Sequence, residues 1–148
     1  MKKKQIKKVF NNEHGGSLLE FALIMPLLFI ILFGIIEFGI LLYDKAMITN
    51  ASREGARAGI VFSDPRTSDE EIIEVVRDYC ANYLISFDES STLIIPPPER
   101  SGNSAGSSLT VRVTYPFRFL VLSNLISLLG GDIESLLTLN AVTVMRLE

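Results

Sequence analysis

Residues 18–43 read LLEFALIMPLLFIILFGIIEFGILLY, and this stretch decides how the rest of the chain is arranged. As an α-helix, these 26 residues cover about 39 Å at 1.5 Å per residue. The hydrocarbon core of a bilayer is about 30 Å thick, so the helix can span it with some tilt or protrude from it.

The composition of this stretch favours insertion into a membrane. Eighteen of its residues are Leu, Ile or Phe. At roughly −0.3 to −0.6 kcal/mol each, they contribute about −5 to −11 kcal/mol to the free energy of insertion. Two acids interrupt it, Glu20 and Glu37. A carboxylate costs about 2.5 to 3.5 kcal/mol at the helix centre and less toward the ends. The two acids make the free energy of insertion less favourable, but it stays favourable. The sequence therefore predicts a membrane-spanning helix surrounded by lipid.

The net charge of −3 is unevenly distributed along the 148 residues. Residues 1–15, a basic leader, contain five lysines against Glu13, whereas nine Lys or Arg and 14 acids follow from Asp44 onward. Close to the span, the five lysines before it outnumber Lys45, Arg53 and Arg57 just after it. By the positive-inside rule this predicts a single-pass protein of the cytoplasmic (inner) membrane with its N-terminus in the cytoplasm and its C-terminal domain outside. The acidic outer domain gives no reason to expect nucleic acid as a partner.

The sequence offers little for catalysis or metal binding. Cys80 is the only cysteine and there is one histidine, so an internal disulfide is impossible and the usual zinc sites would lack ligands. The acids of the outer domain come without a His or Cys pair, a glycine-rich phosphate loop or a nucleophile elbow. No enzyme, catalytic residue, metal or cofactor is therefore expected.

The junction between the leader and the span reads GGSLLEF, residues 15–21. A secretory signal has a short apolar core followed by small residues, whereas here the small residues come first. The junction resembles a type IV prepilin processing site, in which a basic leader and a glycine precede a glutamate at the fifth mature position. A cut between Gly15 and Gly16 makes Glu20 fifth, followed by Phe21. The resemblance implies that a prepilin peptidase removes the leader and leaves the helix on the mature protein.

The same resemblance implies a role for Glu20 in assembly and register, together with Phe21. The carboxylate would pair with the new α-amino group of a neighbouring subunit, here on Gly16. In a low dielectric such a pair fixes the register, because a slipped neighbour leaves both charges unpaired. A carboxylate near enough to the headgroups to stay hydrated is the alternative.

Glu37 is a further candidate for assembly and register, about 10 Å from the midpoint of the span at 1.5 Å per residue. An intramembrane acid is by default a functional-site hypothesis, and any charged partner has to come from another helix or chain. A protonated carboxyl group hydrogen-bonded to its own backbone is the alternative, and the sequence leaves both open. Pro26 lies on nearly the same face and predicts a kink.

After the apolar run the residues are mostly small or polar, and no helix breaker separates the two parts. One helix is therefore predicted from about Gly16 to about Gly59. Ala51, Gly55 and Gly59 are spaced by four and give a smooth face where another backbone can approach closely. Packing within the same chain is the simpler use of this face, and a neighbouring subunit is the other.

Arg53 and Arg57 share a different face, with Glu54 within reach of Arg57. These residues complete a pattern that runs, in order, Gly15-Gly16, Glu20-Phe21, Pro26, Glu37-Phe38-Gly39 and Asn50-Ala51-x-Arg53-Glu54-Gly55-Ala56-Arg57. The pattern resembles the TadE-like family, pseudopilin-like components of the tight adherence (Flp-type IVb) pilus machinery, over roughly the first 60 residues. It implies a role in pilus biogenesis and adhesion, with other pilins or pseudopilins and pilus assembly platform proteins as partners.

The outer domain opens with a turn at residues 63–65 and a predicted helix over residues 69–85. Ser68 and Glu71 predict a capping box at its start. Apolar residues at helical spacing place Cys80 on the buried face, where an inert core thiol is expected rather than a nucleophile.

The remainder of the domain is predicted as short strands and an apolar segment. Phe117–Leu129 is too short to cross a bilayer, and a core helix is expected there, with an exposed membrane or subunit contact as the alternative. Leu109–Tyr115 alternates, with its odd-numbered residues predicted to face inward. The other predicted elements are a strand at Thr92–Ile95, a flexible loop at Ser101–Ser108 and a last strand at Leu136–Leu147.

Together these elements predict an α+β protein in which a long transmembrane helix extends into a small extracytoplasmic domain with one or two helices on a short antiparallel sheet. The expected segments are a leader at 1–15, a transmembrane and extended helix at 16–62 and the outer domain at 63–148. The leading function is a minor pseudopilin-like protein, and the alternative is an uncleaved single-pass protein whose domain binds a partner or ligand. A mature chain beginning at Gly16 would favour the first.

Overall fold

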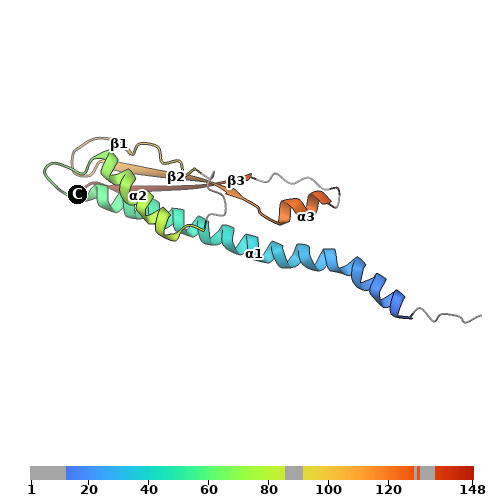
Figure 1. Ribbon diagram of the computed structural model, residues 1–148. Coiled ribbons are helices and arrows are strands. Elements are labelled where there is room, and N and C mark those ends of the chain that lie inside the picture. The colour runs from blue at the N-terminus through green and yellow to red at the C-terminus, as the bar shows by residue number, and fades with distance from the viewer. Residues whose placement is uncertain (1–12, 86–91, 129, 131–135) are drawn as a thin grey trace, which may run out of the picture.

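The computed structural model describes residues 13–85, 92–128, 130 and 136–148 (Figure 1). A single helix, α1 (Glu13–Ile60), contains 48 residues and is about 72 Å long at 1.5 Å per residue. It continues through Pro26, and Figure 1 shows a bend in its blue, N-terminal part. The prediction of one continuous helix is confirmed, and residues 1–12 of the leader lie outside the described residues.

Three antiparallel strands form a sheet in the order β1-β2-β3. β1 (Glu99–Arg100) pairs with the start of β2 (Ser108–Arg118), and β2 pairs along its whole length with β3 (Leu136–Arg146). The predicted alternation is confirmed, because the odd-numbered side chains of β2 from Leu109 to Phe117 are buried. These buried side chains form one face of the sheet.

The predicted strand at Thr92–Ile95 is wrong. Ile94 makes only an isolated bridge to Thr114, and β1 begins after the prolines at 96–98. Proline has no backbone N–H to donate to a strand ladder, so pairing cannot run continuously through three of them. β1 is consequently a two-residue strand at the edge of the sheet.

The predicted core helix over Phe117–Leu129 is wrong in its first part. β2 extends to Arg118, and α3 (Leu122–Leu128) is only seven residues long. Beyond Thr114, β2 has β3 as its one partner among the described strands, so it has a free edge at Pro116. A residue without an N–H is tolerated at such an edge, and the strand therefore continues through it.

The C-terminal half of α1 forms the centre of the domain. It contacts α2 (Asp69–Tyr83), which ends two residues earlier than predicted, and it also contacts β2 and β3, which run alongside it in Figure 1. This half of the helix therefore covers one face of the sheet. The core side chains come from all these elements and include Ile48, Ala51, Ala56, Ile72, Val76, Cys80, Leu109, Val111 and Val113.

Cys80 is buried in this core. Burial raises the pKa of its thiol to about 11. The thiol therefore stays protonated at neutral pH, as an inert core residue does.

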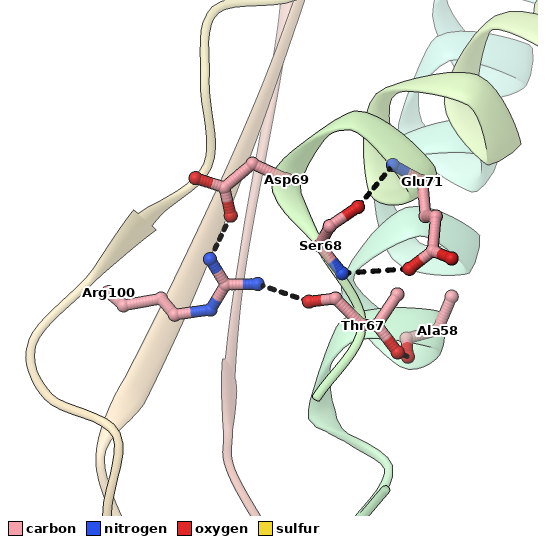
Figure 2. Close-up of polar contacts among 6 residues, drawn as sticks. All are labelled: Ala58, Thr67, Ser68, Asp69, Glu71 and Arg100. Carbon is pink, nitrogen blue, oxygen red and sulfur yellow. Dashed lines mark hydrogen bonds and ion pairs between the residues drawn. The ribbon is translucent and has the colours of Figure 1, made fainter. Parts of the chain in front are cut away.

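A group of polar contacts fixes the start of α2 (Figure 2). The Glu71 N–H donates to Ser68 Oγ at 3.2 Å, and the Ser68 N–H donates to Glu71 Oε2 at 2.8 Å, which is the predicted capping box. Arg100 pairs with Asp69 and donates to the carbonyl oxygen of Thr67 at 3.0 Å. These contacts join β1 to the beginning of α2. The fold is α+β, with a long apolar helix, two further helices and a small antiparallel sheet, as predicted.

Candidate assembly helix

The N-terminal half of α1 has an apolar surface that the other described residues leave uncovered. Most of its large apolar side chains between Leu18 and Ile36 are exposed, with Leu23 at 76%. Within the described ranges, α1 is the one helix long and apolar enough to cross a membrane, and none of its apolar window is buried. Soluble monomers rarely leave so large an apolar surface in water. The helix indicates a single-pass membrane protein.

The junction residues lie at the free end of this helix, away from the domain (Figure 1). Gly15 and Gly16 are both within α1, and a Cβ atom added at Gly16 would meet no atom within 4 Å. Glu20 is exposed, and so is Phe21, at 61%. Another protein can therefore reach Gly16, Glu20 and Phe21 without displacing any described part of the domain.

Glu37 lies in a different environment from Glu20. Its side chain is 5% exposed, and Oε1 accepts the N–H of Val121 at 2.6 Å and the N–H of Leu122 at 3.2 Å. These N–H groups stand at the start of α3, where a helix offers them no internal partner. In this structure Glu37 thus accepts hydrogen bonds from the backbone at the start of α3 and not from its own helix. Oε2 is buried and has no hydrogen-bond partner among the described residues.

Asp44 is a second buried acid of α1, and sequence reasoning missed it. Its side chain is fully buried, and Oδ1 accepts the N–H of Ile85 at 3.0 Å, just after the end of α2. Burial raises the pKa of Asp44, and the hydrogen bond from Ile85 opposes this shift. The position of Asp44 after the apolar run gave no sign of burial, because an acid at the end of a membrane helix is ordinary.

We expect the melting temperature of the detergent-solubilised wild type, compared with that of Asp44→Asn, to fall as the pH rises from 4 to 7. The amide keeps an oxygen that accepts the Ile85 N–H but removes the buried charge. Because the folded-state pKa of Asp44 is raised, the acid favours folding most below its unfolded pKa of about 4, and this contribution is lost as the pH rises through the folded-state pKa. Thermal unfolding at pH 4 and pH 7 measures the difference. A variant less stable than the wild type at pH 7 and equal to it at pH 4 would contradict this assignment.

Gly55 and Gly59 lie where α1 packs closely against α2. A Cβ atom added at Gly55 would lie 2.4 Å from Val76 Cγ2, and one at Gly59 would lie 2.5 Å from Ile72 Cδ1. Ala51, one turn before Gly55, is fully buried. In this structure α2 of the same chain packs against Gly55 and Gly59, and Leu109 of β2 also packs against Gly59.

We expect Gly55→Ala to lower the free energy of unfolding by about 1–3 kcal/mol, the usual cost of overpacking a core. Val76 is β-branched and fully buried, so it cannot turn away from the added methyl group. Gly39→Ala is the matched control, because Gly39 belongs to the same helix and has open space around it. Chemical denaturation in detergent micelles would measure both variants. Equal stability of both variants and the wild type would contradict the close packing described.

Arg57 and Glu54 form the predicted ion pair one turn apart, with 2.6 Å between Arg57 Nη2 and Glu54 Oε1. The hydrogen bond from Arg57 lowers the pKa of Glu54. Arg53 is exposed one turn before Arg57. Exposed ion pairs contribute little to stability, so these residues shape the surface of α1 rather than hold the fold together.

The part of the chain that the structure describes contains no group of three or more His, Cys, Asp or Glu side chains able to hold a metal ion. Residues 15–57 match the model of the TadE-like protein family, which confirms the resemblance drawn from the motifs over that segment. Neither a curated protein nor a solved structure matches the chain. The matched segment begins at the candidate processing site and stops before α2 and the sheet.

Proposed function

We propose that this chain is a minor pseudopilin-like membrane protein that serves the assembly of a tight adherence (Flp-type IVb) pilus or a related secretion system. The TadE-like match suggests a pilus-associated membrane protein. One observation carries the finer proposal: a glycine pair and a glutamate five positions into the mature chain open a helix whose N-terminal half is uncovered.

The first step of the proposal is processing. A prepilin peptidase cuts between Gly15 and Gly16 at the cytoplasmic face of the inner membrane, and the helix stays with the mature protein. Glycine suits such a site because the absence of a side chain permits close approach in a protease cleft. The positive leader keeps the N-terminus in the cytoplasm, and the domain then lies outside.

The second step is lateral assembly through the uncovered half of α1. The domain occupies the C-terminal half of the helix through Gly55, Gly59 and Ile48, so the N-terminal half is left for other pilins or pseudopilins. Helices in lipid associate by close packing and by polar contacts. Glu20 supplies such a contact by pairing with the α-amino group of Gly16 in the neighbouring subunit, and assembly platform proteins receive the resulting bundle.

Pilus output tests this function. Cells that lack the gene are expected to lose pilin from the sheared surface fraction, and the wild-type gene supplied in trans is expected to restore it. Membrane levels of the major pilin serve as the control for expression. Normal pilus output without this chain would overturn the proposal.

A further inference from the structure

α3 and the residues just before it lie beside the membrane segment of α1. Figure 1 shows α3 at the end of the domain that faces the apolar, N-terminal part of α1. The ring centroids of Phe119 and Phe38 are 5.8 Å apart, and Glu37 accepts the N–H groups of Val121 and Leu122. The position of α3 along α1 is therefore fixed at Glu37.

This position places α3 at the outer surface of a bilayer. The apolar run begins at Leu18, and a hydrocarbon core of about 30 Å takes about 20 residues of helix. Counted from Leu18, this length ends near Glu37. The start of α3 then lies at the boundary between acyl chains and headgroups on the side of the domain.

The surface of this segment is apolar toward the outside as well as toward the core. Residues 119–128 read FLVLSNLISL and contain no charged side chain. Phe119 and Leu122 are buried against the domain, whereas Leu120 is 43% exposed and Leu128 is 81% exposed. The ring contact between Phe119 and Phe38, which is 51% exposed, places the segment directly beside the uncovered surface of α1.

Each polar side chain of the segment donates one hydrogen bond within the chain. The Ser123 hydroxyl donates to the carbonyl oxygen of Phe119 at 3.2 Å, the Asn124 amide donates to that of Leu120 at 2.8 Å, and the Ser127 hydroxyl donates to that of Asn124 at 2.9 Å. Transfer of an unpaired polar group out of water is costly, and these bonds reduce that cost. The segment is therefore suited to a partly apolar environment.

We propose that residues 119–128 form a membrane contact that inserts Leu120 and Leu128 among the lipids of the outer leaflet, beside α1. The proposal rests on the transmembrane placement of α1 in the proposed function. The contact fixes how deeply the helix sits and how the domain is oriented on the membrane, because Glu37 ties the two elements together. Apolar side chains that enter the membrane interface favour membrane binding in proportion to the apolar area they remove from water.

Tryptophan scanning tests this contact directly, because the full chain contains no tryptophan. Three full-length variants, Leu128→Trp, Leu32→Trp and Val144→Trp, are placed in phosphatidylcholine vesicles with and without lipids brominated on the acyl chains. Leu32 lies in the span, and Val144 is a 61% exposed apolar residue of β3 that serves as the matched control. Leu128→Trp is expected to lose a fraction of its fluorescence similar to that of Leu32→Trp, with blue-shifted emission, while Val144→Trp is not quenched.

Each other outcome overturns a defined part of the account. If Leu32→Trp is quenched and Leu128→Trp behaves like Val144→Trp, the contact of α3 with lipid is wrong and the placement of α1 stands. If Leu128→Trp is blue-shifted but unquenched, and returns to a water-like emission at high dilution in lipid, a second copy covers α3 instead. If Leu32→Trp is itself unquenched, the transmembrane placement fails with it.

Discussion

Replacing Gly15 with leucine is expected to abolish removal of the leader, so that the variant accumulates in the membrane as the full-length chain. A bulky side chain at this position prevents the close approach of backbone and protease that glycine allows. The apolar helix is unchanged, so insertion proceeds. Intact mass spectrometry of protein from membranes of cells that contain the peptidase measures the processed fraction.

Gly34→Leu provides the matched control for this prediction. Gly34 belongs to the same helix, and an added Cβ atom there would meet no atom within 4 Å. This variant is expected to be processed like the wild type. Normal maturation of Gly15→Leu would remove the assigned cleavage position, even if the family resemblance remains.

Replacing Glu20 with glutamine is expected to leave insertion and processing intact while it strongly reduces pilus assembly. The amide is uncharged and inserts more easily than the carboxylate. It cannot, however, neutralise the α-amino group of Gly16 in a neighbouring subunit. Leaving one charge of a buried pair unpaired costs about 3–5 kcal/mol, roughly a 100- to 4,000-fold loss in association. Pilin in sheared surface fractions and the mass of the mature chain are the two measurements.

Glu74→Gln is the control for the loss of one carboxylate. Glu74 is an exposed residue of α2, on the domain and away from the free end of α1. Its replacement is expected to change neither measurement. Pilus output that is unchanged in Glu20→Gln would rule out the register role and leave Glu20 as a hydrated acid near the headgroups.

The features that the sequence predicts well are those fixed by neighbouring residues. The long helix follows from an apolar run that continues into small and polar residues without a breaker. The capping box of α2 follows from Ser68 and Glu71, which are three positions apart. The alternation along β2 reflects one buried face of the sheet. Local periodicity and local hydrogen bonds are sufficient for all three.

The features that the sequence did not predict depend on distant partners. Glu37 accepts the N–H groups of Val121 and Leu122, which lie 84 and 85 positions later in the chain. Asp44 accepts the N–H of Ile85, which lies 41 positions later. β1 has two residues, too few for any periodicity to appear. β2 can continue through Pro116 because β1 pairs only with the start of β2 and leaves that edge free. Nothing in one local stretch specifies these arrangements.

The two buried acids connect the membrane segment to the domain. Glu37 holds α3 and Asp44 holds the chain after α2, so both elements are fixed to α1 close to the predicted outer end of the span. The membrane segment and the domain also share α1 itself, which runs from one into the other as a single helix.

The most direct test of the account is the N-terminal sequence and intact mass of the wild-type protein, extracted with detergent from membranes of cells with and without the prepilin peptidase. The account predicts a chain that begins at Gly16 and retains the apolar helix when the peptidase is present, and a chain that begins at Met1 when it is absent. A chain that keeps its lysine-rich leader in the presence of the peptidase, or one that has lost residues 18–43, would contradict it.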